Sequence, residues 1–115
     1  MGSMIDDKTA IKEKIIKAIQ GRNKVEISFK KETTEQWAIR KISPYDIYPR
    51  DDRESSKPRD YVIGYIDADI GREAHVFSTY LDNVYAVDIL NEKFSGQDIK
   101  RLVGAKGEPN VARDW

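Results

Sequence analysis

The chain has 115 residues, the usual size of one domain, and 39% of them are hydrophobic against 35% charged, so we expect one compact core under a densely charged surface. Its 20 Lys and Arg balance 20 Asp and Glu, so a nucleic acid could be attracted only by a local basic patch. Cysteine is missing, which excludes a disulfide framework, a thiolate metal site and a thiol nucleophile.

The start of the chain carries no targeting signal. No apolar run is long enough to span a bilayer, and the basic-then-apolar pattern of a secretory signal is missing. We therefore expect a cytoplasmic protein with no membrane contact. Met1-Gly2-Ser3 before Met4 resembles a cloning remnant, so residues 1–4 are expected to form a disordered start. A single domain is predicted over residues 5–103, followed by a tail over 104–115.

An amphipathic helix is predicted next. Asp6 or Asp7 can cap it and Gly21 can end it, because these residue types favour helix termini. Spacings of three to four residues place one apolar stripe on this helix, formed by Ile11, Ile15, Ile16 and Ile19. Four lysines fall mostly off the stripe and predict a solvated basic face: Lys8, Lys12, Lys14 and Lys17.

From Val25 the hydrophobic period changes to two, which is typical of half-buried strands. Pro44 lacks an amide hydrogen, so we expect it to mark a strand boundary or an edge. Charged residues 30–35 predict a hairpin connection, 69–72 a turn and 81–83 a tight connection. The pattern predicts six short strands, at residues 25–29, 36–42, 45–48, 61–66, 74–80 and 84–90.

Two exposed segments complete the chain. Residues 50–59 contain no apolar residue except proline, so this segment is predicted to be a mobile loop. Ser95 can cap a last helix over residues 97–103, which Gly104 ends. The tail that follows is expected to fray.

Short strands with turns every eight to twelve residues favour a mainly β (α+β) fold. We predict a small SH3-like or Sm-like antiparallel β-barrel of five or six strands, with an N-terminal helix and a short C-terminal helix. The single histidine, His75, lies in a strand pattern and is interpreted as a structural or surface residue. Turn chemistry explains the carboxylate pairs Asp51-Asp52 and Asp67/Asp69 better than a metal does.

Catalytic motifs are missing from the sequence. It contains no glycine-rich phosphate loop, no Gly-x-Ser-x-Gly elbow and no nucleophile paired with a base. We therefore expect a protein that is not an enzyme and needs no cofactor or metal.

Aromatic and basic residues interleave along the strands and predict a binding surface. Val62 and Ile66 are fully apolar, so we expect them to face inward, which places Tyr61 and Tyr65 outward. Trp37 and Phe77 are predicted to lie in the core. Tyrosine beside a cation can stack a base or hold an anion, and the candidate ligand-binding or nucleic-acid-binding residues are Lys41, Tyr61, Tyr65, Arg72 and Tyr80.

Four segments together resemble the WYL domain of bacterial and archaeal regulators. They are residues 25–29, 40–47, 61–65 and 81–84, and the resemblance spans Ile15 to Phe94. Lys41, Pro44 and Tyr45 fit the family pattern of a basic residue three before a proline that is followed by an aromatic residue. The Trp-Tyr-Leu strand of the family corresponds to Asp60-Tyr61-Val62, and an asparagine, Asn83, stands where the family usually has an arginine.

The resemblance implies an Sm-type or SH3-type barrel that senses ligands, often single-stranded nucleic acid or nucleotides, in transcription or defence systems. It favours a regulatory module or accessory subunit whose partner is a single-stranded nucleic acid or a nucleotide-like anionic ligand. The alternative is a protein interaction module that binds a peptide or a subunit, or associates with itself as a homo-oligomer.

Overall fold

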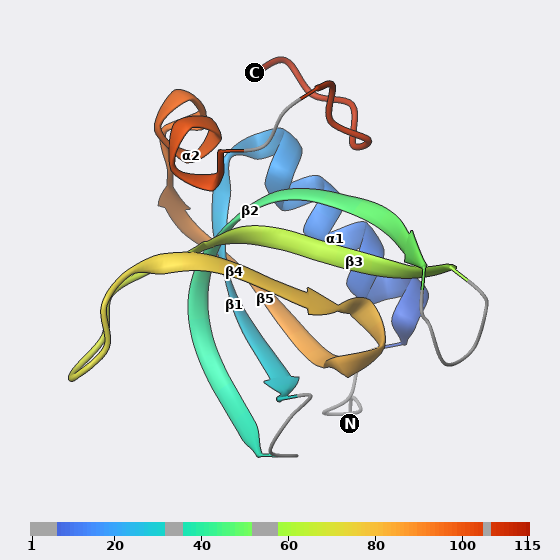
Figure 1. Ribbon diagram of the computed structural model, residues 1–115, viewed down its shortest axis with the longest axis vertical. Helices are drawn as coiled ribbons and strands as arrows, with labels where there is room; N and C mark the ends of the chain where they lie inside the picture. The colour runs from blue at the N-terminus through green and yellow to red at the C-terminus, as the bar shows by residue number, and fades with distance from the viewer. Residues whose placement is uncertain (1–6, 32–35, 52–57, 105–106) are drawn as a thin grey trace.

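The computed structural model describes residues 7–31, 36–51, 58–104 and 107–115 (Figure 1). One antiparallel sheet has the strand order β4-β3-β2-β1-β5 and accompanies two helices, which confirms the predicted mainly β, α+β class. A short 3-10 helix, η1, at Leu81–Asn83 joins β4 to β5. The elements are α1 (Lys8–Gly21), β1 (Asn23–Lys30), β2 (Trp37–Asp51), β3 (Pro58–Ile66), β4 (His75–Tyr80), β5 (Val84–Lys93) and α2 (Gly96–Val103).

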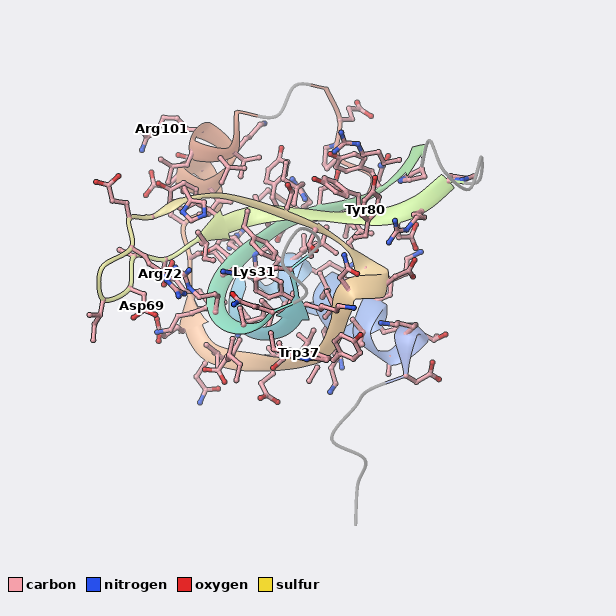
Figure 2. The ribbon with its side chains drawn as sticks, turned by 60° about the horizontal axis from the view of Figure 1, so that its bottom comes forward. Lys31, Trp37, Asp69, Arg72, Tyr80 and Arg101 are labelled. Atoms are coloured by element: carbon pink, nitrogen blue, oxygen red, sulfur yellow. The ribbon has the colours of Figure 1, made fainter. Side chains whose placement is uncertain are left out.

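The sheet curls strongly on itself and forms most of a barrel (Figure 2). Within the described residues, β4 and β5 are its two edges and do not pair with each other. Apolar residues of α1 share one core with the inner face of the sheet, so the helix covers one side of the curl. This core includes Ile11 and Ile15 of α1 with Ile27, Ile42 and Val62 of the strands.

The two strands predicted on either side of Pro44 are one 15-residue strand, β2. Pro44 pairs with Gly64 and Asp46 pairs with Ile63, so Tyr45 is the extra residue of a β-bulge. A bulge tolerates the missing amide hydrogen of proline, which explains why the predicted boundary is wrong and the sheet has five strands. Gly64 permits the close approach of this bulge, because a Cβ there would lie 2.5 Å from the Ser43 carbonyl oxygen.

Helix α1 begins as predicted, with the Asp7 side chain accepting a hydrogen bond from the Thr9 amide. Its left-handed C-cap residue is Arg22 (φ 57°), one residue after Gly21. The predicted solvated lysine face is confirmed in part, because Lys8 and Lys17 are exposed whereas Lys12 and Lys14 are half-buried. Lys12 pairs with Asp60, and two others donate to main-chain carbonyls: Lys8 to Asp82 and Val84, and Lys14 to Val87.

The C-terminal helix begins and ends as predicted. Ser95 is its N-cap, and Gly104, its C-cap, is in the left-handed region. The expected fraying of the tail is wrong for residues 107–115. The Asp46 carboxylate accepts hydrogen bonds from the amides of Asn110 and Val111, at 3.0 and 2.9 Å. The Trp115 indole donates to the Ile19 carbonyl at 2.8 Å. These contacts fasten the tail to the sheet and to α1.

The predicted loop over 50–59 falls largely on residues 52–57, which lie outside the described residues, as do residues 32–35 of the predicted hairpin connection. At its ends the loop prediction is wrong, because residues 50–51 continue β2 and residues 58–59 begin β3. Neither described helix has the length and apolar character that a membrane crossing requires.

Candidate functional site

An open cavity of about 890 Å³ lies along β4 at the uncovered end of the curled sheet. Residues 72–80 form one wall, and β1, β2 and β3 contribute residues that include Phe29, Arg40 and Tyr61. In Figure 2 Lys31 lies over this opening, between Arg72 and Tyr80. Three of its lining residues are basic (Lys31, Arg40, Arg72) and one is acidic (Glu73), so the lining favours an anion.

Arg40 is the buried cation of this cavity. It shares the inner face of β2 with Ala38 and Ile42, and only 8% of it is exposed. Its Nη2 donates to the Asp67 carbonyl at 3.1 Å, and none of the ion pairs within the described residues includes Arg40. No carboxylate among the described residues lies within ion-pair distance of this guanidinium, so its desolvation cost is only partly offset, and an anion entering the cavity would offset it further.

Tyrosines form a row across the outer face of three strands beside the cavity. Tyr48, Tyr61 and Tyr80 lie opposite one another on β2, β3 and β4, and successive rings meet edge to face at 5.6 and 4.9 Å. Arg50 lies over the Tyr61 ring at 4.7 Å and Arg59 over the Tyr80 ring at 3.8 Å. Burial raises the pKa of Tyr48. The row supplies aromatic surfaces next to cations, as stacking on bases requires.

Three of the five predicted site residues line the same cavity, namely Tyr61, Arg72 and Tyr80. Tyr65 lies elsewhere, because it packs against a second apolar cluster of Tyr45, Phe94 and Ile99. The inward placement of Val62 and Ile66 is confirmed, so Tyr65 does face outward from the main core. On that outer side, however, α2 covers it.

Lys41 also lies apart from the cavity. Its Nζ contacts Glu92 Oε1 at 2.5 Å, across the outer face of the sheet. The hydrogen bond to Glu92 raises the pKa of Lys41, and the same bond lowers the pKa of Glu92. Both side chains therefore hold their charges in a local pair, and Lys41 is not among the cavity's lining residues.

The predicted site did not include Lys31, Arg40, Arg50 or Arg59, although Arg40 lies in one of the segments that resemble the WYL domain. Arg40 is in phase with Ile42, an apolar residue of the same strand, and that parity was the available signal. The same alternation places Trp37 on the outer face of β2, so the prediction that Trp37 lies in the core is wrong. Trp37 is 59% exposed and packs on Tyr85, with ring centroids 4.0 Å apart. Phe77 is buried as predicted and meets Phe29 edge to face at 5.0 Å.

The remaining polar candidates have local explanations. His75 is a surface residue as predicted, with Nδ1 2.8 Å from the Glu73 carbonyl oxygen. Asp69 forms the predicted turn with Gly71, whose φ is +72°, and Asp67 pairs with Lys24 at 2.9 Å. The described part of the chain holds no group of three or more side chains suited to a metal ion. The side chains of Asp51 and Asp52 lie outside the described residues.

A similar fold occurs in part of a larger protein. The chain superposes on part of proteasome accessory factor B/C of Arthrobacter aurescens with a TM-score of 0.59 and 16% sequence identity. The match covers 95% of this chain and 15% of that protein. No model of a known protein family and no curated protein matches the sequence.

Proposed function

We propose that this chain is a WYL-like regulatory module that is not an enzyme and binds an anionic ligand in the cavity along β4. The curled sheet with flanking helices agrees with the architecture that the WYL resemblance implies. The similarity to a small part of proteasome accessory factor B/C supports a module that can be built into a longer protein. A cytoplasmic location remains a prediction from composition.

The buried Arg40 carries this proposal. A cation that the fold holds on the inner face of a sheet, with no ionic partner among the described residues, costs stability, and such costs are typical of functional sites. Lys31 and Arg72 add positive charge at the opening, and Tyr61 and Tyr80 add aromatic surface. These five residues form the proposed binding set.

The ligand class that best fits this set is a single-stranded nucleic acid or a nucleotide-like molecule. The guanidinium of Arg40 can take a phosphate in two parallel hydrogen bonds, and the tyrosines can stack a base. Zero net charge does not oppose this, because three basic residues lie together at one cavity. Lys41 and Tyr65 lie outside the proposed set.

Salt dependence of binding tests the proposal. Fluorescence anisotropy with single-stranded hexathymidylate should give an affinity that falls with salt, with a logarithmic slope of about −2 for three phosphate contacts. Arg40→Gln should weaken binding and reduce that slope by about 0.7. Arg101→Gln is the matched control, because Arg101 is an exposed residue of α2 that pairs with Asp98 and lies away from the cavity (Figure 2).

Equal loss of affinity in the two variants would contradict the proposal, because it would reflect net charge and not a site. An affinity that salt does not change would also contradict it. A second candidate function, protein interaction, is favoured by a different feature, the open edge of β4.

A further inference from the structure

Strand β4 has one paired edge and one open edge. It pairs with β3 over its whole length, from Tyr80 opposite Tyr61 to His75 opposite Ile66. On its other side no strand of the described residues pairs with it. An open edge presents main-chain donors and acceptors that can add another strand.

The other edge strand, β5, is protected. Lysines of α1 donate to its main chain, Lys8 to the Val84 carbonyl at 2.6 Å and Lys14 to the Val87 carbonyl at 3.3 Å. Charged side chains on an edge are a common protection against strand addition. Among the residues that the structure describes, one edge of the sheet is therefore covered and the other is left unpaired.

The cavity follows the open edge. Its lining includes Phe77 and Thr79 from the inner face of β4 together with Val76 and Ser78 from the outer face. Because residues from both faces of β4 line the cavity, the cavity runs along the unpaired edge of this strand. An extended chain in this position would place alternate side chains against the apolar inner wall, where Phe77 meets Phe29.

The charge of the lining selects among extended chains. Lys31, Arg40 and Arg72 outnumber Glu73, so an acidic chain is complementary. We propose that an extended, acidic segment of a partner protein adds to the open edge of β4 as a sixth strand. This goes beyond the anionic-ligand proposal, because main-chain hydrogen bonds to β4 would hold the segment. The two occupants would compete for one cavity.

Nuclear magnetic resonance with synthetic peptides tests this inference. The probe is a capped hexapeptide of alternating glutamate and valine, added to the 115-residue chain. It should shift the β4 amide signals and slow their hydrogen exchange. Two further peptides carry N-methyl groups, one on the glutamates and the other on the valines. Because alternate amides of a strand point to opposite sides, one methylated peptide should lose about tenfold or more in affinity and the other should retain it.

A pair of variants separates edge binding from general surface binding. Val76→Glu adds a negative charge to β4 and should weaken the acidic peptide. Ile39→Glu makes the same change at an exposed aliphatic residue on the outer face of β2, which is not among the residues that line the cavity, and should leave affinity unchanged. Equal effects of the two substitutions would overturn the inference.

The remaining outcomes are also decisive. Equal binding of both methylated peptides would overturn strand addition, because main-chain pairing would then not contribute. If hexathymidylate slows exchange of the β4 amides and the peptide does not, strand addition is wrong and the anionic-ligand proposal stands. If the peptide binds with the expected methylation pattern and hexathymidylate does not bind, the inference stands and the nucleic-acid assignment is wrong.

Discussion

Replacing Arg40 by methionine should stabilise the protein while abolishing anion binding. Methionine is unbranched, flexible and uncharged, and although it is shorter than arginine it can occupy the same inner-face position. A residue selected for folding alone would show the opposite effect on stability.

The magnitude follows from the contacts of Arg40. The substitution removes one hydrogen bond to the Asp67 carbonyl, which costs about 1.5–3 kcal/mol for a charged donor. It also removes the desolvation penalty of a buried charge that has no carboxylate partner within the described residues, which is several kcal/mol. We expect a net gain of about 1–2 kcal/mol in the free energy of unfolding. For a chain of this size, the melting temperature should then rise by roughly 4–8 °C.

Urea unfolding of wild type and Arg40→Met measures this gain, with an unchanged m-value showing that the unfolding reaction is the same. Arg101→Met serves as the control and should change stability by less than about 0.5 kcal/mol, because Arg101 is exposed. A loss of more than about 1 kcal/mol in Arg40→Met would refute the reasoning, because Arg40 would then be a structural residue.

Three further predictions concern residues around the site. Tyr61→Ala should weaken hexathymidylate binding by about 1–3 kcal/mol. Tyr65→Ala should lower stability and leave binding unchanged, since α2 covers Tyr65. Equal losses of binding in fluorescence anisotropy would contradict this prediction. Trp115→Ala should lower the free energy of unfolding by about 2–4 kcal/mol in urea titrations, and an unchanged midpoint would mean that the tail does not stabilise the domain. Lys41→Met should raise the pKa of Glu92 toward its ordinary value in carboxyl NMR titrations. The depressed pKa of Glu92 stabilises the fold above the ordinary glutamate pKa, and this is lost as pH falls through the lowered value; an unchanged pKa in the variant would contradict the pairing.

Helices and strands were predictable from the sequence where nearby residues alone determine them. The spacing of Ile11, Ile15 and Ile19 and the caps at Asp7 and Ser95 depend only on nearby residues, and both helices agree with them. The join across Pro44 was not predictable by this means. It depends on Gly64, some 20 residues further along, which allows the bulge to approach β3.

The site was predicted in part for a related reason. Tyr61, Arg72 and Tyr80 were predictable because aromatic and basic side chains are the usual contacts of bases and phosphates. All three line one cavity. Arg40 was missed because an arginine in a strand is ordinarily assigned to the solvent face. The coverage of Tyr65 by α2 depends on packing between distant parts of the chain, which strand parity does not describe.

The Nε–H signal of the Arg40 side chain tests the central claim most directly. In a titration with hexathymidylate at low salt, this signal should shift and saturate together with the amides of Tyr61 and Tyr80. A saturating titration that leaves the Arg40 signal unchanged would contradict the claim that this cavity binds anions.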